Sequence, residues 1–141
     1  MSVNLLNLRP SPLLLVACAA TTPPMTQPRG TEPAQLARLL HEDIEALGEI
    51  AHRLAGQCDA LIRELDAHVR VMQQHAVEAK AMAGDPAKGP QLKHEMAALP
   101  AGGDSDAIAR DLASGYLACG EPRKEELRAV IDRIPDYTQT E

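Results

Sequence analysis

The chain has 141 residues and a formal net charge of −6 at pH 7. This length fits one domain, and the acidic balance without a Lys or Arg cluster argues against a nucleic-acid partner. Trp and Phe are absent and the only aromatic residues are Tyr116 and Tyr137. The core must therefore be aliphatic, and a ligand pocket lined by aromatic rings is not expected.

A short apolar run near the N-terminus ends in the tetrad Leu15-Val16-Ala17-Cys18, downstream of Arg9. The tetrad resembles the lipobox of bacterial lipoproteins, and the chain as a whole is similar to small lipoproteins with a helical domain that carries two cysteines. The resemblance implies a signal peptide over residues 1–17, a lipidated Cys18 and attachment to the membrane through that lipid. Residues 18–32 are rich in Pro and Thr and predict a disordered tether.

Residues 33–83 carry the longest regular pattern and predict helix, with Thr31 as the N-cap and Pro33 in the first turn. With residue 58 at heptad position a, the a positions are Ala37, Ile44, Ala51, Cys58, Leu65, Met72 and Ala79. The d positions are Leu40, Leu47, Leu54, Leu61, His68, His75 and Met82. One unbroken helix of this region would be about 75 Å long and would imply a homo-oligomeric coiled coil. A compact monomer needs a break, for which Gly56-Gln57 is the expected joint.

The second half of the chain predicts shorter helices that fold back. Gly84-Asp85-Pro86 ends the long helical region, and residues 90–98 form a short helix. Asp104, Ser105 and Asp106 begin a helix through Ala118, with the apolar face Ile108, Leu112 and Leu117. A last helix follows Pro122 and ends before Pro135, with Leu127, Val130, Ile131 and Ile134 buried. We therefore expect an all-α antiparallel helical hairpin or bundle of about four helices over residues 33–135, and a flexible tail over residues 136–141.

The cysteine count is odd, so lipidation of Cys18 would leave one pair, Cys58 and Cys119. In an oxidising compartment these two residues could form a disulfide, which an antiparallel return of the chain would favour. The alternative is two buried free thiols in a cytosolic protein, because free cysteine is often buried.

His68, Met72 and His75 lie on one helical face at a spacing that can hold copper or haem. The same three positions belong to the a/d stripe, where a structural role is the simpler interpretation. Acid pairs such as Glu42-Asp43 and Glu64 with Asp66 have basic neighbours and predict a solvent-facing charged surface. No catalytic motif is found, so no enzyme activity and no cofactor are expected.

These observations favour a non-enzymatic, lipid-anchored helical protein of the bacterial cell envelope that acts as an interaction or structural module for a protein partner. One alternative is a periplasmic metal- or haem-binding bundle that uses His68, Met72 and His75. Another is a cytosolic coiled-coil adaptor with a disordered N-terminus, located in the cytoplasm.

Overall fold

A computed structural model describes residues 31–100 and 103–137 of the chain. The described residues all belong to one unit of the chain, residues 31–141. The predicted signal peptide, Cys18 and most of the predicted tether lie outside the described residues. Within the described ranges every regular element is a helix, which confirms the all-α class.

Two long helices form an antiparallel hairpin, α2 (Pro33–Arg53) and α3 (Cys58–Ala83). They are separated by the turn at residues 54–57, so the predicted joint at Gly56-Gln57 is present. Every a and d position of the predicted stripe is buried or partly buried. The hairpin buries the apolar stripe within one chain. The stripe therefore does not need a second copy of the chain to cover it, as it would in an unbroken helix.

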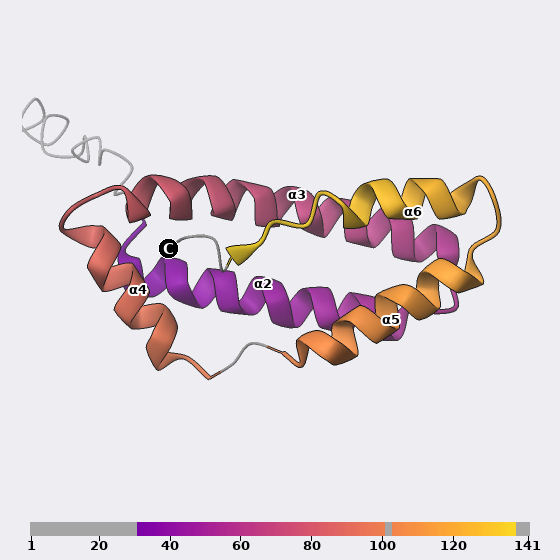
Figure 1. The fold of residues 1–141 in the computed structure, drawn as a ribbon, viewed down its shortest axis with the longest axis horizontal. Coiled ribbons are helices and arrows are strands. Elements are labelled where there is room, and N and C mark those ends of the chain that lie inside the picture. Colours follow the sequence, from indigo (N-terminus) through magenta and orange to yellow (C-terminus); the bar gives the residue numbers. More distant parts are fainter. Residues whose placement is uncertain (1–30, 101–102, 138–141) are drawn as a thin grey trace, which may run out of the picture. The chain divides into compact units, whose positions relative to one another are not determined.

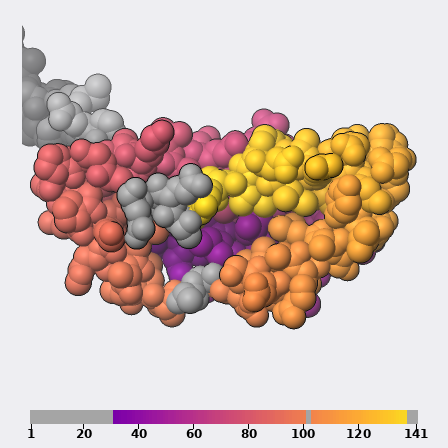
Figure 2. Space-filling model, in the orientation of Figure 1, coloured from indigo at the N-terminus to yellow at the C-terminus, as the bar shows by residue number. Residues whose placement is uncertain are grey.

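Three shorter helices pack against this hairpin: α4 (Lys88–Ala98), α5 (Ser105–Ala118) and α6 (Arg123–Ile131). Helices α4 and α5 contact both α2 and α3, and α6 packs mainly on α3. Figure 1 shows α4 beside the N-terminal half of α2 and α5 beside its C-terminal half. In Figure 2 the three short helices cover much of one face of the hairpin. The core is aliphatic, with Leu36, Leu40, Leu61, Leu65, Met72, Leu92 and Leu127 fully buried.

The predicted start of α5 is confirmed in detail. Asp104 is the N-cap, and its carboxylate accepts hydrogen bonds from the backbone N–H groups of Asp106 and Ala107 at 3.0 and 3.2 Å. These bonds satisfy N–H groups that have no partner inside the helix. The apolar face predicted for α5 is wrong at Leu117, which is 74% exposed. The pattern placed Leu117 with Ile108 and Leu112, but it lies nine residues after Ile108 and so turns away from their face.

Two predictions at the ends of the domain also need correction. The N-cap of α2 is Glu32 rather than Thr31, and the Thr31 hydroxyl instead donates to Glu78 Oε2 at 3.0 Å. The predicted flexible tail is wrong at Tyr137, which is only 6% exposed and belongs to the core cluster. Residues 132–137, here called the C-terminal strap, follow α6, and in the view of Figure 1 they run between α2 and α3.

No helix in the described part of the chain combines the length and the hydropathy that crossing a bilayer requires.

Candidate functional site

A disulfide closes one end of the helical domain. Cys58 begins α3 and Cys119 follows α5, and the two sulfurs are bonded with a Cα–Cα distance of 5.4 Å. The bond joins the turn of the hairpin to the C-terminal half of the chain. Around it, Gly115 of α5 lies against Leu61 of α3, where a Cβ atom on residue 115 would come within 2.6 Å of the Leu61 side chain. The cysteines that the sequence analysis pairs are therefore bonded to each other in the structure.

A second feature of the domain is a buried carboxylate in the middle of the hairpin. Asp43 of α2 is 5% exposed, and it is the one charged residue that is fully buried among the described residues. Its Oδ2 atom lies 2.7 Å from the Tyr137 hydroxyl and 2.7 Å from His75 Nδ1. Its backbone oxygen lies 2.8 Å from His68 Nε2. Three elements, α2, α3 and the C-terminal strap, therefore meet at Asp43, and we call these four residues the Asp43 cluster.

The acceptors in the Asp43 cluster fix where its protons lie. An ionised carboxylate and a backbone carbonyl can only accept hydrogen bonds, so His75 donates from Nδ1 and His68 donates from Nε2. The Tyr137 hydroxyl donates to Asp43 and also lies 3.1 Å from the backbone oxygen of Met72. Burial and the neighbouring carboxylate raise the pKa of Tyr137 far above its ordinary value, so the phenol stays protonated as a donor.

The candidate metal ligands His68, Met72 and His75 do lie along one side of α3, but the two imidazoles bond to different atoms of Asp43. The Met72 side chain is fully buried among apolar neighbours. Within residues 31–100 and 103–137, no group of three or more His, Cys, Asp or Glu side chains is placed to hold a metal ion. The observed hydrogen bonds give both imidazoles a role in joining α3 to α2.

Asp43 is the residue that the sequence interpretation missed. It was assigned with Glu42 to a solvent-facing pair, which is correct for Glu42 and wrong for Asp43. A signal was present, because Leu36, Leu40, Asp43 and Leu47 follow one another at the spacing of a single helical face. An acid at that spacing is typical of a buried carboxylate that needs hydrogen-bond donors from elsewhere in the fold. Tyr137, 94 residues away, gave no local sign that it was one of them.

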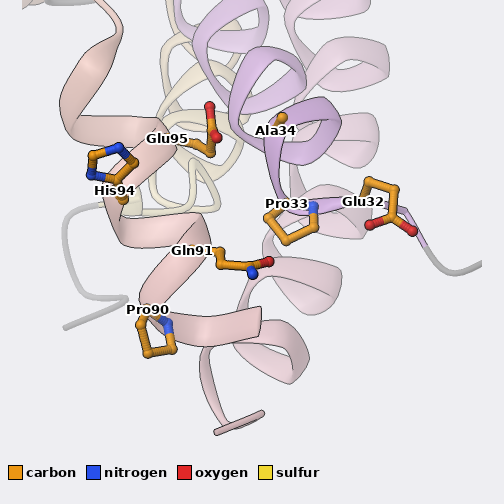
Figure 3. A pocket seen from close by; sticks show the side chains of 7 residues that line it. All are labelled: Glu32, Pro33, Ala34, Pro90, Gln91, His94 and Glu95. Atoms are coloured by element: carbon orange, nitrogen blue, oxygen red, sulfur yellow. The ribbon is translucent and has the colours of Figure 1, made fainter. Parts of the chain in front are cut away.

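Two of the surface depressions of the domain lie away from the disulfide. The larger, of about 530 Å³, lies between the N-terminus of α2 and α4, and Figure 3 shows its walls formed by Glu32, Pro33 and Ala34 on one side and Pro90, Gln91, His94 and Glu95 on the other. It is open and shallow, and its polar groups do not converge on one point. The smaller, of about 160 Å³, is mainly apolar and has the Tyr137 ring in its wall, together with Leu40, Ile44, Met96 and Leu99. This second depression is here called the apolar cleft.

Comparisons of the chain with protein-family models, with curated proteins and with solved structures found no match. The features of the chain that bear on its function are therefore the disulfide, the Asp43 cluster and the sequence of the N-terminal segment.

Proposed function

We propose that this chain is a non-enzymatic, lipid-anchored protein of the bacterial cell envelope, and that its helical domain is an interaction module. The observation that carries the proposal is the disulfide between Cys58 and Cys119. Structural disulfides persist mainly in proteins that leave the reducing cytosol. With two of the three cysteines paired, the third is Cys18, which ends the lipobox-like tetrad.

The position of the attachment point supports this proposal. Thr31 belongs to the predicted tether of residues 18–32 and lies two residues before α2, and its hydroxyl contacts Glu78 in the last turns of α3. The disulfide lies at the other end of the hairpin, where α2 ends and α3 begins. A lipid on Cys18 would thus tether a domain whose α3 is about 39 Å long through the end opposite the disulfide.

The domain's polar groups support an interaction module better than an enzyme. Asp43 bonds to His75 and to Tyr137, and Tyr137 also bonds to the Met72 backbone oxygen, so each of these hydrogen bonds joins two different parts of the fold. General acid–base catalysis would require one of these groups to reach a substrate proton. Since Asp43 and Tyr137 are nearly fully buried, the cluster is better suited to positioning the strap than to chemistry.

Metabolic labelling with an alkyne analogue of palmitate tests the proposal in cells. We expect label and membrane fractionation for the wild-type chain, and loss of both for Cys18→Ala. The double variant Cys58→Ser/Cys119→Ser is the matched control, because it removes the same chemical group elsewhere and should keep the label. A wild-type chain that stays soluble and takes up no label would contradict the lipid anchor and would favour the cytosolic coiled-coil adaptor.

A further inference from the structure

The Tyr137 side chain fills a pocket that is selective by its chemistry. Its hydroxyl lies within hydrogen-bond distance of two acceptors on different helices, Asp43 Oδ2 on α2 and the Met72 backbone oxygen on α3. Its ring belongs to the aliphatic core cluster and forms part of the wall of the apolar cleft. An occupant therefore needs a flat apolar body with a hydroxyl donor at its tip, which among natural side chains is a tyrosine.

The carboxylate is what makes this pocket selective. An apolar residue at position 43 would continue the buried stripe of α2, whereas a buried Asp requires donors in order to be tolerated. His75 supplies one donor to Oδ2 and the phenol supplies the other. A site built to bond a hydroxyl discriminates strongly against the analogue that lacks it, because its own polar group is then left short of a partner.

The chain's own occupant is attached by a short segment whose start is fixed. Arg133 bonds to Asp66 of α3, and the Arg133 backbone oxygen accepts from Gln73 Nε2 at 3.2 Å. Only three residues, Ile134, Pro135 and Asp136, separate this anchor from Tyr137. Release of Tyr137 from the pocket would therefore involve only this short segment and would leave the contacts of Arg133 with α3 in place. The apolar cleft of about 160 Å³ beside the ring adds space of the size that accepts a benzene ring in other proteins.

We propose that the pocket formed by Asp43, Met72 and the apolar cleft is a recognition site for a tyrosine side chain of a partner polypeptide, and that Tyr137 of the C-terminal strap is its internal competitor. Binding of the partner would release the C-terminal strap from α2 and α3, so that Tyr137 would move from the core to solvent. This inference rests on the proposed role as an interaction module and adds the chemistry of its partner. It is independent of the lipid anchor.

The first experiment uses the purified full chain carrying Tyr137→Ala, which empties the pocket. The probe is p-cresol, the side-chain analogue of tyrosine, and toluene is the matched probe without the hydroxyl. We expect p-cresol to bind saturably and about tenfold or more tightly than toluene, measured by calorimetry or by the thermal midpoint. The control variant is Tyr116→Ala, which removes a ring that lies beside Lys124 instead of a carboxylate and should show no preference for p-cresol. Equal binding of the two probes to Tyr137→Ala would overturn the proposal.

A second experiment tests displacement in a chain with an intact pocket and does not depend on the folding of Tyr137→Ala. In Tyr116→Phe, Tyr137 is the sole tyrosine, so fluorotyrosine labelling gives one ¹⁹F signal. We expect p-cresol, and not toluene, to move this signal to the position of a solvent-exposed tyrosine while the helical circular-dichroism signal is unchanged. A signal that stays at its buried position up to the solubility limit of p-cresol would overturn displacement. If the wild type were a dimer and Tyr137→Ala a monomer, the site would bind a second copy of this chain. That result would overturn the assignment to a different partner.

These outcomes can be separated from those of the palmitate labelling. Failure of p-cresol to bind leaves the label on Cys18 unaffected, and a chain without lipid can still show the preference for the hydroxyl.

Discussion

Replacing Tyr137 with Phe removes one oxygen atom from the Asp43 cluster and keeps the ring. Asp43 then loses the donor at 2.7 Å and retains only His75 on the same oxygen. Hydrogen bonds to charged groups contribute about 1.5–3 kcal/mol to stability, and the loss is largest when the remaining partner is buried. For a domain of this size we expect a fall of the thermal midpoint of roughly 6–20 °C.

The pH dependence gives this prediction a second, independent readout. The pKa of Tyr137 is raised in the folded protein, so the unfolded chain releases the phenol proton first as the pH rises. The stability that Tyr137 contributes is therefore fully present below the ordinary tyrosine pKa of about 10 and is lost above it. The slope for one such group is about 1.36 kcal/mol per pH unit.

Urea denaturation followed by circular dichroism measures both effects, with the disulfide kept intact. The control is Tyr116→Phe, which keeps the ring under the Lys124 ammonium group and removes a hydroxyl that has no role in the Asp43 cluster. We expect the difference between wild type and Tyr137→Phe to shrink between about pH 9 and about pH 11, and the difference for Tyr116→Phe to stay small. A Tyr137→Phe variant as stable as Tyr116→Phe at neutral pH would refute the buried contact.

Three further sets of variants test the fold. The double variant Cys58→Ser/Cys119→Ser opens a loop with a sequence separation of 61 residues. Urea denaturation should show that the free energy of unfolding falls by about 4 kcal/mol, and reduction of the wild type should have the same effect. An unchanged free energy of unfolding would mean that the disulfide does not form. Asp104→Ala removes the N-cap of α5 and should cost about 1 kcal/mol, while Asp104→Ser keeps most of it, so equal losses would contradict the cap. Gly89→Ala places a Cβ atom 2.6 Å from the backbone oxygen of Ala83 and should destabilise by about 1–3 kcal/mol. As the control, a Cβ atom at position 56 meets nothing within 4 Å, so Gly56→Ala should leave the stability unchanged or raise it slightly. A Gly89→Ala variant more stable than Gly56→Ala would show that the α3–α4 turn is packed differently.

Local signals predicted most of the helical architecture because each depended on neighbours in sequence. The a/d stripe of α2 and α3 repeats every three or four residues, and burial of such a face is the main reason for a helix to form. The capping carboxylate of Asp104 acts on N–H groups two and three residues away. The pairing of Cys58 with Cys119 was accessible for a different reason, since counting cysteines and folding the chain back on itself required no knowledge of side-chain contacts.

The Asp43 cluster could not be predicted as a whole because its members are brought together by tertiary structure. Asp43 and Tyr137 are 94 residues apart, and neither the strap's path nor its end point is encoded by a periodic pattern. Leu117 shows the opposite error, in which an apolar residue was assigned to the core although it is 74% exposed. Surfaces of folded proteins contain many single apolar residues, so composition alone does not decide burial.

The measurement that tests the central claim most directly is the intact mass of the natively expressed chain from the membrane fraction, with and without reductant, for wild type and Cys18→Ala. We expect a mass equal to residues 18–141 plus lipid, which Cys18→Ala should lose, and a gain of two hydrogens when reductant breaks the bond between Cys58 and Cys119. An unprocessed, soluble chain with three free thiols would contradict both the lipid anchor and the disulfide.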